Sequence, residues 1–146
     1  MPGDTIEREL TLQAPIERVW RAITDPAEVS KWFGVETEID LTPGGDVAFG
    51  WSQGRFRARV EAVEPPRRFA YRWCLDSDTP VDEGPTTVVE FTLRPEGDGT
   101  HLRLVESGFA SLPENGRARH LADNTKGWAE ELAELQAYVE GAGVPD

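Results

Sequence analysis

The chain has 146 residues, with 15 Lys and Arg against 27 Asp and Glu, and a formal net charge of −12. This length fits one domain over residues 1–146, and the acidity argues against nucleic acid and anionic membranes as partners. Cys74 is the only cysteine, which excludes an intrachain disulfide and any multi-cysteine metal site.

The first third of the chain predicts one strand and two short helices. Residues 6–13 alternate apolar and polar side chains, as a half-buried strand does. Pro15 then opens a helix, because proline fits the first helical turn. Asp25 and Pro26 end that helix and begin a second one with Asp25 as its N-cap, and Gly34 ends the second helix.

Residues 35–75 predict antiparallel strands, because their apolar side chains recur with period two. A turn at residues 52–53 would pair Phe49 with Phe56 and place the apolar side chains of both strands on one face. Residues 76–85 contain four acids and two prolines, and we expect an exposed loop there.

The last hairpin, residues 86–107, carries one acid on its apolar face. If Leu93 opposes Leu102, then Val89 opposes Glu106 on the inward side. A long helix is expected over residues 118–140, with Gly141 as its stop. The element order predicts an α+β fold, in which helices cover one face of an antiparallel sheet.

Five segments of the chain resemble one protein superfamily in order and spacing. They read APIERVWRAITDPAEVSKWF at 14–33, PGG at 43–45, VEAVEPPRRFAYRW at 60–73, VVEFTLRPEGDGTHLRLVESGF at 88–109 and GWAEELAELQAYV at 127–139. The set resembles the START or Bet v 1-like superfamily (SRPBCC), and within it the activator of Hsp90 ATPase homologue-like family.

This resemblance implies a helix-grip fold, a curved antiparallel sheet wrapped around a long C-terminal helix. Two short helices would follow the first strand, and a cavity would lie between the sheet and the long helix. The superfamily includes lipid carriers, cyclases, dehydratases and co-chaperone domains, so the fold does not settle the function.

The candidate cavity residues are the inward-facing aromatic side chains together with one acid. We expect Trp51, Tyr71 and Trp73 to face the cavity, and Phe49, Phe56 and Phe91 to lie at its packed end. The full candidate set is Trp32, Phe33, Phe49, Trp51, Tyr71, Trp73, Phe91, Glu106, Phe109 and Trp128.

Glu106 has two interpretations at the sequence level. An inward carboxylate can orient a ligand or act as an acid or base, with Tyr71 as its partner in a cyclase-like or dehydratase-like enzyme. Alternatively, Glu106 caps the loop that follows its strand by accepting from backbone N–H groups near Gly108 and Phe109. The second interpretation is favoured, because the strand ends there.

Metal and cofactor chemistry find no support in the sequence. His101 and His120 are the only histidines, and neither has a partner at a ligand spacing, so we expect two solvated side chains. No glycine-rich nucleotide motif occurs. Arg55, Arg57, Arg59, Arg68 and Arg72 share the outer sheet face, where Glu61 and Glu90 can interleave as a salt-bridge ladder.

The leading hypothesis is a non-catalytic carrier or sensor that binds a small apolar or amphipathic molecule and needs no cofactor. The alternatives are the Glu106–Tyr71 enzyme and a protein-interaction or chaperone-linked module. No apolar run approaches the roughly 20 residues of a membrane helix, and no signal-peptide pattern is present. We therefore expect a cytoplasmic monomer or homodimer.

Overall fold

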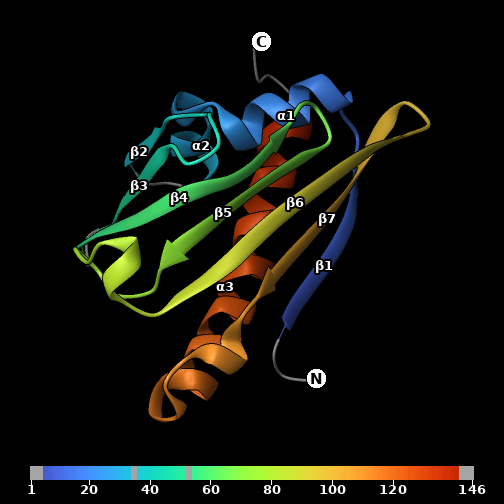
Figure 1. Ribbon diagram of the computed structural model, residues 1–146. Coiled ribbons are helices and arrows are strands. Elements are labelled where there is room, and N and C mark those ends of the chain that lie inside the picture. The colour runs from blue at the N-terminus through green and yellow to red at the C-terminus, as the bar shows by residue number, and fades with distance from the viewer. Residues whose placement is uncertain (1–4, 34–35, 52–53, 142–146) are drawn as a thin grey trace.

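The computed structural model describes residues 5–33, 36–51 and 54–141, with Trp51 described by its backbone alone. Within these residues seven strands form one antiparallel sheet in the order β1-β7-β6-β5-β4-β3-β2 (Figure 1). The strands are β1 (Thr5–Leu12), β2 (Glu36–Ile39), β3 (Asp46–Trp51), β4 (Gly54–Glu64), β5 (Arg68–Cys74), β6 (Thr86–Glu96) and β7 (Gly99–Ser107).

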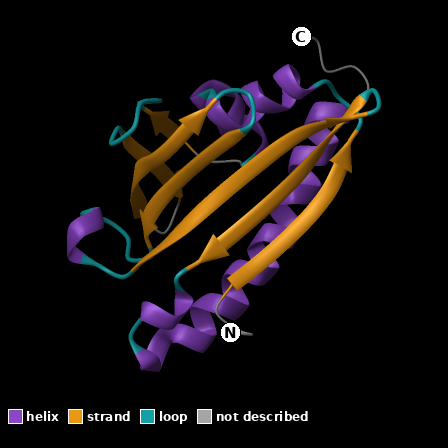
Figure 2. Ribbon diagram, turned by 45° about the vertical axis from the view of Figure 1, so that its right-hand side comes forward, coloured by secondary structure: helices purple, strands orange, loops and turns teal. Residues whose placement is uncertain are grey.

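Three α-helices lie on one face of this curved sheet (Figure 2). They are α1 (Ile16–Thr24), α2 (Pro26–Trp32) and the long α3 (Glu114–Glu140); two single-turn 3₁₀ helices, η1 (Val81–Glu83) and η2 (Phe109–Ser111), lie in loops. The predicted α+β helix-grip arrangement is confirmed. In the described residues no helix is long and apolar enough to span a lipid bilayer.

The strand registers follow the apolar alternation of the sequence. Phe49 pairs with Phe56 across β3 and β4, and Leu93 pairs with Leu102 across β6 and β7, as predicted. The β3–β4 turn expected at residues 52–53 lies outside the described residues. Alternation fixes these registers because a slip of one residue would turn every apolar side chain of a strand toward solvent.

Two boundaries differ from the sequence prediction. Helix α3 begins at Glu114 rather than near residue 118, because Pro113 supplies the helix start and Gly116 continues the helix without breaking it. The 76–85 segment is not wholly exposed. It forms η1, which buries Val81 and sets Asp82 against Arg59 of β4, with two contacts at 3.0 Å.

The outer sheet face carries the predicted ladder of ion pairs. Arg72 contacts Glu61 at 3.3 Å, and Arg68 bridges Glu64 and Glu90. These pairs are partly exposed, so each contributes little to stability, about 0–1 kcal/mol. The face is therefore a solvated ladder and not a concentrated basic patch.

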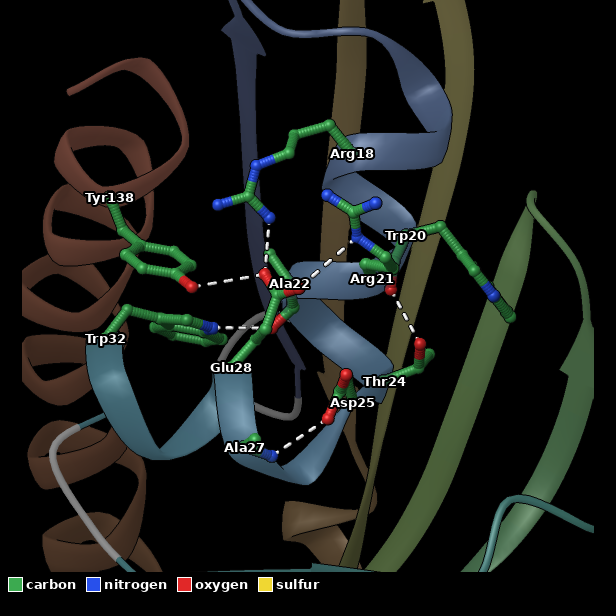
Figure 3. Close-up of polar contacts among 10 residues, drawn as sticks. All are labelled: Arg18, Trp20, Arg21, Ala22, Thr24, Asp25, Ala27, Glu28, Trp32 and Tyr138. Atoms are coloured by element: carbon green, nitrogen blue, oxygen red, sulfur yellow. Dashed lines mark hydrogen bonds and ion pairs between the residues drawn. The ribbon is translucent and has the colours of Figure 1, made fainter. Parts of the chain in front are cut away.

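Glu28 of α2 joins the three α-helices near the last turns of α3 (Figure 3). Its carboxylate forms ion pairs with Arg18 and, at 3.3 Å, with Arg21, both of α1. It also accepts a hydrogen bond from the Tyr138 hydroxyl of α3 at 3.2 Å. Burial alone raises the pKa of Glu28, but the hydrogen bond and charge of Arg18 outweigh it and hold that pKa below its ordinary value.

The predicted N-cap between α1 and α2 is also present (Figure 3). The Asp25 side chain accepts from the Ala27 N–H at 2.9 Å. Trp32, at the end of α2, donates its indole N–H to the Ala22 carbonyl at 2.7 Å. These bonds fix α2 on α1 and thereby place Phe33, the next residue, against the sheet.

Candidate functional site

Glu106 lies on β7 with its side chain enclosed between the sheet and α3. It pairs with Ile6 of β1 and with Val89 of β6, both of which are buried. Its own exposed fraction is 0%. The opposition of Val89 and Glu106 predicted from the hairpin is confirmed, and it places a carboxylate within the apolar interior.

Four side chains donate hydrogen bonds to the Glu106 carboxylate. Trp128 Nε1 donates to Oε1 at 2.8 Å. Oε2 accepts from Thr87 Oγ1 at 2.5 Å, Asn124 Nδ2 at 2.9 Å and Trp73 Nε1 at 3.0 Å. The interpretation of Glu106 as a cap for the following loop is therefore wrong, because its partners are side chains of β5, β6 and α3.

The four groups that donate to Glu106 are all electrically neutral. Within the described part of the chain, no Lys or Arg forms an ion pair with this carboxylate. A buried anion is tolerated when hydrogen bonds replace its hydration. Its field extends to Tyr71: burial and the Glu106 charge together raise the pKa of the Tyr71 hydroxyl well above its ordinary value.

A cleft of about 430 Å³ opens between α3 and the sheet. Its sheet side is aromatic and apolar, and its helix side is polar except for Gly127 and Trp128. The lining residues are Phe33, Phe56, Trp73, Cys74, Leu75, His120, Asp123, Asn124, Gly127, Trp128 and Glu131. Those from α3 recur at helical spacing, so a single face of the helix forms one wall of the cleft.

Glu106 lies directly behind the wall of this cleft. Trp73, Asn124 and Trp128 line the cleft, and the same three side chains donate to the carboxylate. The rings of Trp73 and Trp128 lie with centroids 6.0 Å apart, and Phe33 stacks on Trp128 at 5.9 Å with an interplanar angle of 14°. The buried acid thus fixes the orientation of the aromatic wall.

A second group of the candidate cavity residues encloses almost no free space. Trp32, Phe49, Tyr71 and Phe91 surround a void of about 10 Å³, which is about the size needed for one water molecule. Tyr71 and Glu106 both pair with Val89, so they lie two strands apart at one level of the sheet. No hydrogen bond in the described residues joins them.

The remaining candidates are placed as follows. Phe109 is fully buried in η2 and does not line the cleft. Phe56, expected at the packed end, lines the cleft, whereas Tyr71, expected in the cavity, lies in the filled interior. The side chain of Trp51 lies outside the described residues. The cleft is therefore displaced from the predicted cavity toward Trp73 and the first half of α3.

Sequence reasoning missed the polar wall of the cleft and two donors to Glu106. The wall residues His120, Asp123 and Asn124 look like an ordinary solvated helix face, and Thr87 looks like an ordinary strand residue. A usable signal was present in the spacing, since positions 120, 123, 124, 127, 128 and 131 share the helix face of Trp128.

Glu131 is the acid of the cleft wall whose pKa is most clearly changed. Burial first, and then the charges of Glu134 and Glu130, raise the pKa of Glu131 from 4.5 to about 7. Between those two pH values the folded chain holds a proton that the unfolded chain has released. The free energy of unfolding therefore falls as pH rises through this window, and the whole penalty is present above pH 7.

We expect Glu131→Gln to stabilise the protein at pH 8 and to leave its stability almost unchanged at pH 4.5. The gain should be about 1–2 kcal/mol, which allows for solvent screening of a partly exposed group. Urea denaturation at the two pH values measures it. Glu17→Gln, an exposed acid on α1, is the control. An equal change for Glu131→Gln at both pH values would contradict the assignment.

The two histidines lie in different parts of the fold. His101 Nε2 lies 2.8 Å from Glu9 on the outer face, and His120 lines the cleft. In the described ranges no three His, Cys, Asp or Glu side chains are grouped so that they could hold a metal ion.

The sequence matches one family model over residues 13–140, that of the activator of Hsp90 ATPase homolog 1-like proteins. The chain belongs to this family. The resemblance found in the five sequence segments is thereby confirmed. No curated protein sequence matches the chain significantly.

Solved structures agree with the assignment to the activator of Hsp90 ATPase homolog 1-like family. MLL2253 from Mesorhizobium loti is 28% identical, with 90% of this chain and 93% of that chain covered and a TM-score of 0.77. CalU16 from Micromonospora echinospora is 30% identical over 97% and 81% of the two chains, with a TM-score of 0.73. The Aha1 dimer from Colwellia psychrerythraea, at 19% identity, 95% and 98% coverage and a TM-score of 0.77, shares the fold.

Proposed function

We propose that this chain binds a small apolar or amphipathic molecule in the cleft between α3 and strands β4 and β5, without transforming it. The observation that carries this proposal is the cleft itself. Its volume of about 430 Å³ falls within the usual range of small-molecule sites, about 300–1,000 Å³. Apolar walls with a few polar groups, here Asn124 and Glu131, are also typical of such sites.

The placement of the two candidate catalytic groups favours binding over turnover. Both oxygens of Glu106 are occupied by donors, and the carboxylate lies behind the cleft wall. Tyr71 belongs to the filled interior and not to the cleft. An acid and a base must reach the same substrate atoms, and neither group borders the space where a substrate fits.

A protein-interaction role is the second candidate, either as a homodimer or with a chaperone. The Colwellia neighbour was solved as a dimer, which gives this alternative its support. Light scattering at several protein concentrations distinguishes the alternatives when it is combined with the binding experiment below.

We expect the neutral dye N-phenyl-1-naphthylamine to bind the protein with one-to-one stoichiometry and to quench tryptophan emission, because Trp73 and Trp128 line the cleft. Gly127→Leu should abolish binding, since a Cβ at Gly127 meets no atom within 4 Å and a larger side chain would fill the cleft. Dye titration measures both effects.

The matched control is Ala129→Leu, which adds the same side chain to the exposed face of α3. It should bind the dye as the unchanged protein does. Bound dye should also raise the melting temperature with concentration, as a ligand of the native state does. Unsaturable binding, or equal binding by Gly127→Leu, would refute the cleft as the site.

A further inference from the structure

The charged groups at the cleft are all acids. Asp123 and Glu131 line its helix wall. They are eight residues apart and lie on the same face of α3. Among the described lining residues none is Lys or Arg, and His120 is the only base. The chain as a whole carries a net charge of −12, which adds a long-range field of the same sign.

The aromatic wall of the cleft is backed by a further negative charge. Trp73 and Trp128 each donate their indole N–H to Glu106, so a ligand meets the rings and not the N–H groups. Indole is the aromatic group that best attracts cations. A carboxylate bonded to the ring edge increases the electron density of the ring and strengthens that attraction.

Among the residues that the structure describes, the donors to Glu106 are neutral and no cation is paired with its charge. Trp73 and Trp128 contact this buried anion through their indole N–H groups, and they line the same cleft as the two wall acids. A cation seated on the indoles would be attracted by Glu106 and by the wall acids. An anion in the same place would be repelled by all of them.

We propose that the ligand of this cleft is an organic cation, an amine or quaternary ammonium group carried on an apolar body. The inference rests on the proposed binding function and adds the chemical class of the ligand. The cationic head lies against Trp73, Trp128 and the carboxylates of Asp123 and Glu131, and the apolar body lies along Phe33 and Phe56.

Three probes of nearly equal shape test the proposal: benzyltrimethylammonium, its uncharged carbon analogue neopentylbenzene, and the anion phenylmethanesulfonate. Their dissociation constants are measured by tryptophan quenching and by NMR titration at pH 8. We expect the cation to bind about tenfold or more tightly than neopentylbenzene, and the anion to bind most weakly.

The double variant Asp123→Asn with Glu131→Gln tests whether these two acids cause the preference for the cation. It should reduce the advantage of the cation over neopentylbenzene to about threefold or less, the remainder coming from the indoles. The control, Glu17→Gln with Asp98→Asn, removes two exposed acids outside the cleft and makes the same change in net charge. It should keep the full preference.

The outcomes separate this inference from the proposed function. If neopentylbenzene and the neutral dye bind but the cation binds no better, the cationic ligand is refuted and cleft binding stands. If the control variant loses the preference equally, the net charge and not Asp123 and Glu131 causes it, and the assignment is refuted. If no probe and no dye binds, the proposed function itself fails.

Discussion

Replacing Glu106 with alanine should lower the free energy of unfolding by about 4 kcal/mol or more. The change removes the acceptor of the buried Thr87 and Trp128 donors and of the half-buried Asn124 donor, and it leaves Trp73 Nε1 with Thr87 Oγ1 as its acceptor. Each buried donor that loses its partner costs about 1–3 kcal/mol, and some will find a new one. Urea denaturation of the variant measures the loss.

Glu106→Gln removes the charge and one acceptor oxygen but keeps nearly the same side-chain volume, so it measures the effect of hydrogen bonding and charge apart from that of packing. The amide has one acceptor oxygen, and its NH₂ group must then face either Trp128 Nε1 or the three donors at Oε2. We expect a loss of about 2–3 kcal/mol despite the nearly unchanged shape. Glu7→Ala, at an exposed acid paired with Arg103, is the control and should cost about 1 kcal/mol or less. A loss below 1 kcal/mol for Glu106→Ala would contradict the network.

Trp128→Ala should destabilise the protein by about 3–5 kcal/mol, as large-to-small core substitutions do. The ring is 3% exposed and contacts Phe33, Trp73 and Phe91 at centroid distances of about 6 Å. The substitution also removes one donor from Glu106. Trp128→Phe retains a ring but no N–H, so it should lose about 1–3 kcal/mol.

The difference between these two Trp128 variants measures packing apart from hydrogen bonding. Thermal and urea unfolding should rank them in the same order. If Trp128→Ala loses less than about 1 kcal/mol, the indole is not a structural part of the cleft wall.

The strands and the inward position of Glu106 were predictable, whereas its hydrogen-bond partners were not. Alternation with period two fixes which residues of β6 and β7 oppose each other, so Val89 leads to Glu106. The donors come from β5, β6 and α3, and Asn124 lies on a helix whose rotation against the sheet no local pattern specifies. Long-range packing alone brings them to one carboxylate.

The position of the cleft escaped prediction for a related reason. Inward aromatic side chains can either fill an interior or line a space, and their sequence positions do not distinguish the two. Phe49 and Tyr71 contact each other at a centroid distance of 5.6 Å and fill the interior. Two strand positions further along, Trp73 reaches the cleft, because most of the α3 residues that face it there, from His120 to Gly127, are not buried against the sheet.

The two halves of α3 differ in how firmly the fold holds them. Its buried residues, Trp128, Leu132 and Leu135, all lie in the C-terminal half, where Tyr138 also joins Glu28. The first half includes Gly116 and Gly127, and glycine inside a helix is less favourable than alanine by about 1 kcal/mol. Helix segments with little buried apolar surface open and bend at low free energy.

The lining of the cleft therefore has a rigid part and a compliant part. Trp73 of β5 and Trp128 of α3, both held by Glu106, offer the same surface to every ligand, whereas the start of α3, with His120 in the cleft lining, can shift to admit bodies of different width. The shape of the cleft then discriminates only weakly between ligands that carry the same charge. A site built in this way is suited to a range of chemically related molecules and not to a single compound.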